Sequence, residues 1–181
     1  AQIESQLSAI ASLKMDELQN WRNERLADAG LFYRNDDFSG LVRRYLEIPG
    51  DTDAQNRLAR WLEKIQANPG YKRVSLLDAE GGERISSPAA PEPPNDYLSD
   101  QVAPSLASGQ ITMLDFHRDT ADGPIHLALL VPIFDPQNGS PLGILNLRID
   151  PEIYLYPALQ QWPAPSQSAE TLLVRRQGDQ A

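Results

Sequence analysis

The chain has 181 residues, an apolar fraction of 41% and a formal net charge of −9 at pH 7, enough for one globular domain with part of a second. It has no cysteine, which excludes disulfides, thiolate metal sites and a cysteine nucleophile. It also lacks a basic cluster that could neutralise a run of phosphates, so we expect neither nucleic acid nor an anionic membrane surface as a partner.

The N-terminal third of the chain predicts three helices. Residues 1 to about 33 form one apolar stripe with spacings of three and four, typical of a long helix. This helix could cover a core, or continue upstream into a membrane anchor. A short helix capped by Asp37 or Ser39 is expected to run to about Leu46, followed by a third helix over about 54–67.

The remainder of the chain is dominated by strand patterns, which are runs rich in branched residues bounded by turn formers. We expect strands at 71–78, 83–87, 111–116, 125–134 and 142–149, and a further strand at 170–176. Short helices are expected at 97–106, between the second and third strands, and at 152–161. The proline-rich stretch 88–95 predicts an extended loop.

Alternation along the two longest strands separates an aliphatic sheet face from a mixed one. The aliphatic face is expected to carry Leu127, Leu129, Val131, Leu145, Leu147 and Ile149. We expect the long helix to cover it. The opposite face carries His126, Asn146 and Arg148 among apolar residues. With the proline-rich loop and the 97–106 helix as a lid, such a half-polar face is what a small-ligand pocket needs.

This order of elements resembles the extracytoplasmic Cache (PAS-like) sensor domains of bacterial receptors. Three segments carry the resemblance: YKRVSLLDAEGGERISS, HLALLVPIFDPQNGSPLGILNLRIDP and LYPALQQWPAPSQSAETLLVRRQGD. The last looks like the junction between the membrane-distal and membrane-proximal modules of double-Cache sensors, which precede histidine kinase, PAS or diguanylate cyclase modules.

The resemblance implies an α+β fold, with an antiparallel sheet of about five strands and the long N-terminal helix packed on one face. Residues 1–160 would form the membrane-distal module, and residues 161–181 the junction and first strand of a truncated membrane-proximal module. The tyrosine, arginine and tryptophan cluster and the strand aspartate of amino-acid-binding members have no counterpart that we can place here, so no ligand residues are carried over.

Arg148 and Asp115 are two candidate ligand-binding residues on the predicted sheet. Arg148 could form a bidentate pair with a ligand carboxylate. The alternatives are an internal salt bridge, to Asp115 for example, or exposure at the strand end. Asp115 and His117 share one strand face and could act as a polar pair, although a solvated edge strand would look the same.

Three further candidates are Asn146, on the mixed face, His126 as a pocket donor, and Tyr97, which could reach over the sheet from the lid or pack in the core. The two histidines of the chain, nine residues apart, show no metal-ligand spacing, so we expect neither a metal nor another cofactor. Catalytic motifs are absent as well. Trp21 and Trp61, on apolar helix faces, are expected in the core.

Together with the absence of catalytic motifs, the resemblance implies a non-enzymatic, periplasmic input module of an inner-membrane receptor. It would bind a small, anionic molecule and relay the signal through the long helix, which would also support a homodimer. The alternative is a ligand-free structural or protein-interaction module of the same receptor. In that case Asp115 would neutralise Arg148, and Leu130 and Phe134 would fill the pocket.

Overall fold

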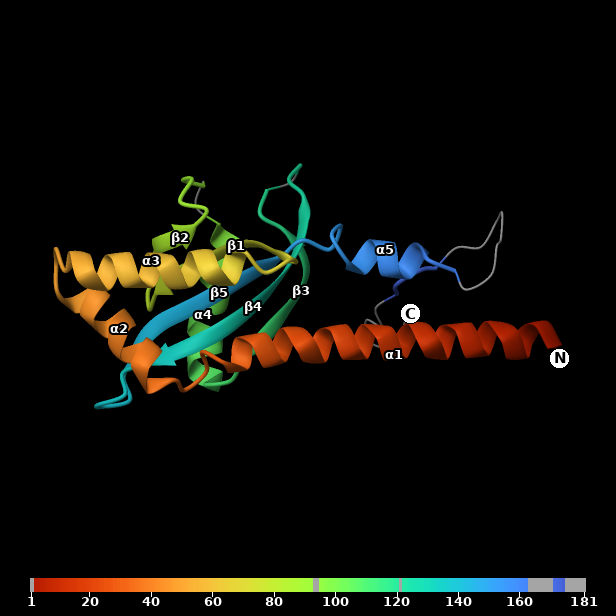
Figure 1. The fold of residues 1–181 in the computed structure, drawn as a ribbon, viewed down its shortest axis with the longest axis horizontal. Helices are drawn as coiled ribbons and strands as arrows, with labels where there is room; N and C mark the ends of the chain where they lie inside the picture. The colour runs from red at the N-terminus through yellow and green to blue at the C-terminus, as the bar shows by residue number, and fades with distance from the viewer. Residues whose placement is uncertain (1, 93–94, 121, 163–170, 175–181) are drawn as a thin grey trace.

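The computed structural model describes residues 2–92, 95–120, 122–162 and 171–174. An antiparallel five-stranded sheet, with strand order β2-β1-β5-β4-β3, forms the centre of the α+β fold (Figure 1). The strands are β1 (Tyr71–Asp78), β2 (Glu83–Ser87), β3 (Thr112–Arg118), β4 (Ile125–Phe134) and β5 (Pro141–Ile149), and the helices are α1 (Gln2–Gly30), α2 (Asp36–Glu47), α3 (Thr52–Gln66), α4 (Asp96–Ser108) and α5 (Leu155–Gln160). The expected fold class and the strand positions of the central sheet are confirmed.

Three helices cover the aliphatic face of the sheet. α1 packs on β4, α2 on β5, and α3 on β1 and β2. The sequence predicted that the long helix covers this face, but α2 and α3 cover parts of the face as well. Asn35 and Asp51 cap these two helices by accepting hydrogen bonds from backbone N–H groups, because a side-chain oxygen at this position satisfies an otherwise unpaired donor. The prediction of Asp37 or Ser39 as the first cap was wrong.

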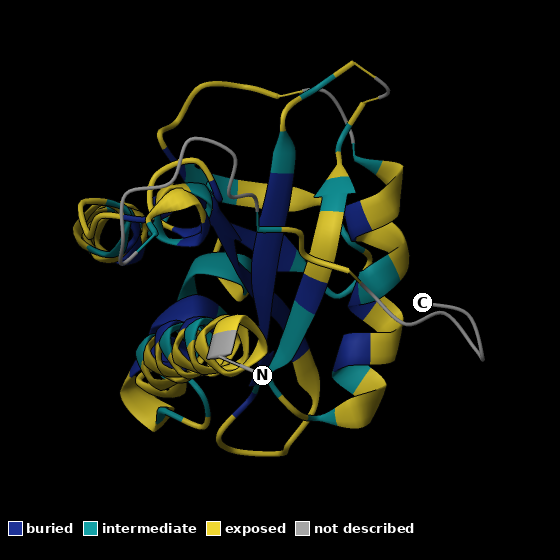
Figure 2. Cartoon of the chain, turned by 90° about the vertical axis from the view of Figure 1, so that its right-hand side faces the viewer, coloured by how far each residue is buried: buried dark blue, intermediate teal, exposed yellow. Residues whose placement is uncertain are grey.

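α4 covers the opposite, mixed face. Its buried side chains Leu98 and Val102 pack with Leu114, Ala128 and Leu130 in a second, smaller apolar cluster. Viewed along α1, the buried strands lie between the helices of the two layers (Figure 2). The sheet thus separates a large aliphatic core from a smaller core that adjoins polar strand residues.

Only the C-terminal half of α1 packs on the sheet, and the N-terminal half extends past it beside α5 (Figure 1). Trp21 and Ala29 are buried, whereas Ile3 and Leu7 are exposed although they belong to the same stripe. Lys14 is the buried residue of α1 nearest to the exposed N-terminal half of the helix, and its ammonium group donates to the carbonyl of Ala158 in α5. α1 therefore covers the core, as one of the two alternatives required, but only with its C-terminal half.

The C-terminal tail gave the least accurate prediction. α5 begins at Leu155, three residues later than expected. The strand expected at 170–176 falls partly outside the described residues, and the four that are described, 171–174, are not in a strand. The predicted boundary between two modules at residues 160 and 161 stays a prediction. Within the described residues no helix is both long and apolar enough to cross a membrane.

β5 passes unusually close to β1 at Gly143. Its backbone φ of +154° is one that residues with a side chain rarely adopt. A Cβ atom at this position would also lie 2.0 Å from the carbonyl oxygen of Leu77. Glycine is therefore required at this position of the central strand.

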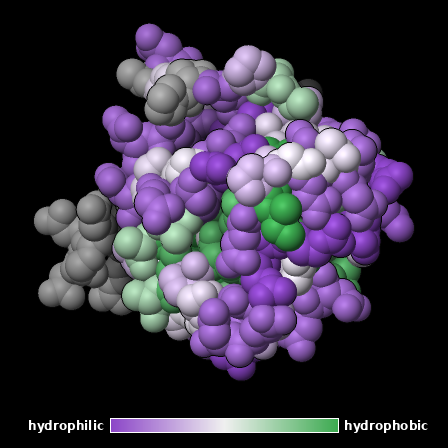
Figure 3. All heavy atoms as spheres, turned by 90° about the vertical axis from the view of Figure 1, so that its left-hand side faces the viewer, coloured by the Kyte–Doolittle hydropathy of each residue, from purple (hydrophilic) through white to green (hydrophobic). Residues whose placement is uncertain are grey.

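At the end of the molecule formed by α2 and the turn after β4, hydrophilic side chains surround a small hydrophobic group (Figure 3).

Candidate functional site

Four buried polar side chains of the mixed face come from two neighbouring strands, β1 and β5. Arg73 lies opposite Arg148, and Ser75 lies opposite Asn146. The two arginines are only 2% and 7% exposed. Because a buried charge must be paired or neutralised, the neighbours of these arginines decide what the site can bind.

Arg148 is held by two carboxylates from segments outside the sheet. Its guanidinium donates to Glu92 at 2.8 Å and lies 3.0 Å from Asp119. Asp115, the partner considered in the sequence analysis, is not among its ion-pair partners. Of the alternatives to ligand binding, the internal salt bridge is therefore present, with Glu92 and Asp119 in place of the example considered, Asp115.

Arg73 was not among the predicted site residues. It donates to both carboxylate oxygens of Glu83, at 2.7 and 3.3 Å, to the hydroxyl of Ser86 at 2.8 Å and to the carbonyl of Pro88 at 3.0 Å. The same guanidinium lies 3.6 Å from Glu92. Glu92, 39% exposed at its side chain, therefore bridges the two buried arginines.

Two histidines adjoin this cluster. His126 of β4 is opposite His117 of the edge strand β3, and both face Asp119, at 3.7 and 3.8 Å respectively. Burial lowers the pKa of His126, and nearby Arg148 lowers it further, against the opposing effect of Asp119. His126 Nδ1 is buried and has no hydrogen-bond partner among the described residues. Within the same part of the chain, no group of three or more potential ligands could hold a metal ion.

Asn146 is a second buried polar residue that has an atom without a hydrogen-bond partner among the described residues. Its amide donates to the hydroxyl of Ser75 at 3.3 Å, whereas its Oδ1 is buried without a partner among the described residues. An unsatisfied acceptor in a core costs free energy. Asn146 therefore marks a point on the mixed face where a further donor would stabilise the protein.

The remaining predicted site residues lie at the edge. Tyr97, in the first turn of α4, is 40% exposed and packs against His117, with ring centroids 4.8 Å apart and ring planes tilted by 31°. It thus reaches over the sheet rather than packing in the core. Asp115 is exposed in β3, where a register shift interrupts pairing, and its carboxylate accepts from the backbone N–H of Phe116 at 2.8 Å. Asp115 thus lies at an exposed position of the edge strand.

A cavity of about 410 Å³ opens beside Arg148. It is bounded by the β1–β2 turn, by Glu92 and by the start of α4, and its lining residues are Leu77, Glu80, Gly81, Gly82, Glu83, Glu92, Asn95, Leu98, Ser99 and Arg148. Of the five predicted ligand residues, only Arg148 lines it. Asn95 also caps α4 and donates to Asp119, so the helix start is tied to the Arg148 cluster.

Solved structures share this arrangement of helices and sheet. The ligand-binding domain of the Pseudomonas aeruginosa amino acid chemoreceptor PctC, in complex with GABA, is 22% identical with a TM-score of 0.56, over 84% of this chain and 66% of that one. The sensor domain of the Vibrio cholerae histidine kinase DctB is 16% identical with a TM-score of 0.61, over 89% of this chain and 62% of that one. This chain has the fold of bacterial sensor domains.

A third sensor domain with this fold is that of the Pseudomonas fluorescens chemoreceptor CtaA in complex with L-alanine, with 16% identity, a TM-score of 0.56, and coverage of 87% of this chain and 64% of that one. The chain thus spans less than two thirds of the length of these sensor domains. No protein family and no curated protein matches the sequence itself. The expected Cache-type fold is confirmed by structure alone.

Sequence reasoning missed four charged members of the cluster, Arg73, Glu83, Glu92 and Asp119. A signal existed for Arg73, because alternation with the buried Val74 places it on the mixed face. Glu92 and Asp119 lie between regular elements, where no periodicity indicates which way a side chain points.

Proposed function

We propose that this chain is the extracytoplasmic input domain of a membrane-bound bacterial signal-transduction receptor, and that it binds a small molecule in the cavity beside Arg148. The observation that carries the proposal is a buried arginine at the wall of a cavity of about 410 Å³, a volume in the range of small-molecule sites. It occurs in a fold whose solved examples include chemoreceptor domains in complex with GABA and with L-alanine.

The charges favour a ligand with an anionic group that takes the place of Glu92. Glu92 is the most exposed carboxylate partner of Arg148 and makes one hydrogen bond to it, whereas Asp119 is more buried. A ligand carboxylate in this position would keep both arginines paired while releasing Glu92 to solvent. This exchange conserves the buried charge, so it avoids the cost of an unpaired guanidinium.

The relay is proposed to pass through the sheet to α1. Leu147 neighbours Arg148 in β5 but points to the opposite face, where it belongs to the core that α1, α2 and α3 share with the sheet. A ligand that binds two packings of this core unequally would shift the balance between them. We place the domain in the periplasm, ahead of a histidine kinase or diguanylate cyclase module, with α1 as the element of a homodimer and residues 161–181 as the start of a second module.

A thermal-shift screen against small carboxylates, amino acids, amines and sugars tests the proposal. A ligand at 100 times its dissociation constant adds about 2.7 kcal/mol, which raises Tm by roughly 5 to 10 °C in a domain of this size. We expect the shift to be lost in Arg148→Lys, which keeps the charge but cannot form a two-pronged contact. Arg84→Met is the matched control, because this exposed arginine does not line the cavity.

One observation favours the ligand-free alternative: both sides of the Arg148 guanidinium are already paired within the protein. A ligand-free module would show no shift with any compound class. Absence of any shift would therefore contradict the binding proposal.

A further inference from the structure

The outward face of α3 carries a surface that the sensor proposal does not use. Arg57, Arg60, Trp61 and Lys64 follow helical spacings of three and four, and all four side chains are exposed. Trp61 was expected in the core, but 43% of it is exposed. α3 packs on the aliphatic side of the sheet, so this surface lies on the other side of the sheet from the arginine cluster.

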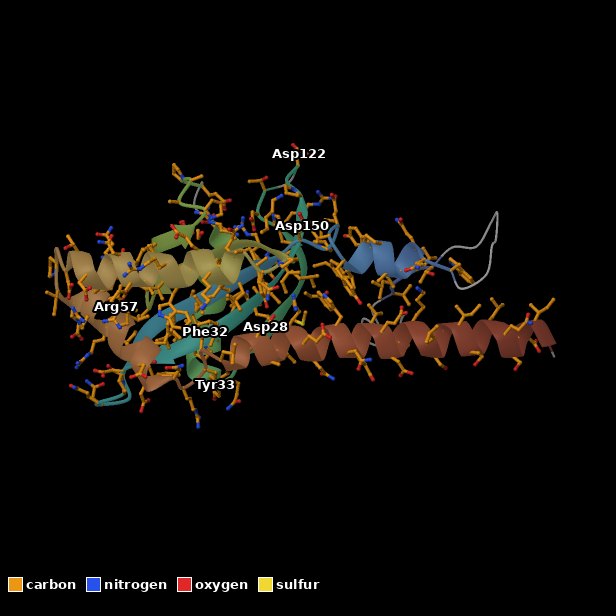
Figure 4. The ribbon with its side chains drawn as sticks, in the orientation of Figure 1. Asp28, Phe32, Tyr33, Arg57, Asp122 and Asp150 are labelled. Carbon is orange, nitrogen blue, oxygen red and sulfur yellow. The ribbon has the colours of Figure 1, made fainter. Side chains whose placement is uncertain are left out.

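Trp61 is held rigidly by two aromatic neighbours. Its ring makes edge-to-face contacts with Phe32 and Phe38, at centroid distances of 5.9 and 6.4 Å, and these two rings contact each other at 5.1 Å. Phe32 follows directly after α1, and Arg57 lies on α3 on the same side of the sheet (Figure 4). A half-exposed indole fixed in this way would lose little entropy on binding, which is the usual property of an interface hot spot.

Trp61 lines two hollows, one on either side of its ring. One of about 640 Å³ is lined by Leu31, Phe32, Phe38 and Leu41, with the polar residues Asn35, Asp37 and Arg57. The other, of about 270 Å³, lies on the Lys64 side and is lined by Leu31, Ile65 and Tyr71 among others. Leu31 borders both hollows and is 68% exposed. The surface is therefore an apolar ridge with a depression on either side.

Positive charge borders this ridge in a protein whose net charge is −9. A third hollow of about 230 Å³ is formed by Trp61 with Arg57, Arg60 and Lys64. Arg57 has a distant, exposed partner in Asp53 at 3.8 Å. Among the described residues, no ion-pair partner is present for Arg60 or Lys64. Carboxylates of a binding partner could therefore pair with Arg60 and Lys64.

We propose that this Trp61 surface is a docking site for an acidic segment of a partner protein. Apolar side chains of that segment would enter the hollows on either side of Trp61, and its carboxylates would meet Arg57, Arg60 and Lys64. The three hollows adjoin one another along the Trp61 ridge, so the surface fits an extended or helical segment better than a single small anion. Complementary charge would mainly speed association and select the partner, and the aromatic ridge would supply most of the affinity.

The test is selection of random dodecapeptides displayed on phage against the intact chain, followed by fluorescence anisotropy with the enriched peptides. We expect enriched sequences with several carboxylates around two bulky apolar residues. Their affinity should fall at least about tenfold in Trp61→Ala. It should fall similarly in Arg60→Glu combined with Lys64→Glu, where the changed side chains are exposed and folding is preserved. Ile48→Ala, at an exposed apolar residue away from this surface, is the matched control and should bind as the wild type does.

Three results would overturn the proposal. The first is enrichment of neutral or basic peptides, or of none. The second is unchanged affinity of the acidic peptides in both variants. The third is self-association of the chain that disappears in the same variants, because the occupant would then be a second copy rather than a different protein. None of these results bears on ligand binding beside Arg148, which is tested separately.

Discussion

Replacing Glu92 by glutamine should make the arginine site bind carboxylates more tightly. Glu92 contacts Arg148 at 2.8 Å and Arg73 at 3.6 Å, and it is the carboxylate that a ligand would have to displace. In the wild type, the ligand must first break this internal pair. In Glu92→Gln the charge that competes with the ligand is gone, so the ligand binds without that cost.

The size of the effect follows from the exposure of the two partners. The side chain of Glu92 is 39% exposed and that of Arg148 is 9% exposed, so the pair belongs near the upper end of the 0.2 to 1 kcal/mol typical of solvent-accessible pairs. A loss of about 1 kcal/mol corresponds to roughly fivefold tighter binding of the ligand. The same loss should lower Tm by only about 2 to 4 °C, because Arg148 keeps Asp119.

The assay is isothermal titration of the strongest carboxylate from the thermal-shift screen into wild type, Glu92→Gln and Glu80→Gln. Glu80 lines the same cavity but has no ion pair with either arginine. Glu80→Gln therefore removes one negative charge without freeing a guanidinium, and its gain in affinity should be smaller. Equal gains in both variants would reduce the effect to general electrostatics, and weaker binding in Glu92→Gln would refute the displacement argument.

Three further predictions concern stability. Burial lowers the pKa of His126 below its ordinary value of 6.5, so the unfolded state takes up a proton more readily than the folded state as the pH falls. The free energy of unfolding, measured by urea denaturation at each pH, should therefore fall between pH 7.5 and pH 5.5. The fall should be smaller in His126→Gln. Gly143→Ala should cost about 3 kcal/mol or more, because the new Cβ would lie 2.0 Å from the Leu77 carbonyl; a loss below about 1 kcal/mol in the same assay would contradict this geometry. Asn95→Ala should cost about 1 to 2 kcal/mol through the lost α4 cap, and Asn95→Asp, which keeps the cap but places a second carboxylate against Asp119, should recover only part of that loss.

The sequence predicted the sheet well because its strands are long and their apolar residues alternate. Leu145 and Leu147 of β5 face the large core, and Asn146 and Arg148 face the smaller one, as alternation required. No comparable pattern indicates which charged side chains form ion pairs with each other. Whether Arg148 meets Asp115 or Asp119 depends on the path of a loop and on a register shift in β3, and neither leaves a periodic trace.

Helix faces were predicted less accurately, for a related reason. An apolar stripe shows which side of a helix can be buried, but not how much of its length meets another element. Ile3 at the far end of α1 is 72% exposed and Trp61 on α3 is 43% exposed, although both lie on predicted stripes. In both cases the sheet or its neighbours do not extend far enough to cover the residue, which only the tertiary arrangement reveals.

The register shift in β3 has a consequence for assembly. β3 is an edge strand, and pairing with β4 is interrupted between Leu114 and His117. An irregular edge presents its unpaired backbone groups out of step with those of an approaching strand, so it resists edge-to-edge growth of the sheet. The other edge, β2, has only five residues. Higher-order contacts of this domain should therefore form through helices and loops, and assemblies built from it should not be held together by strands shared between molecules.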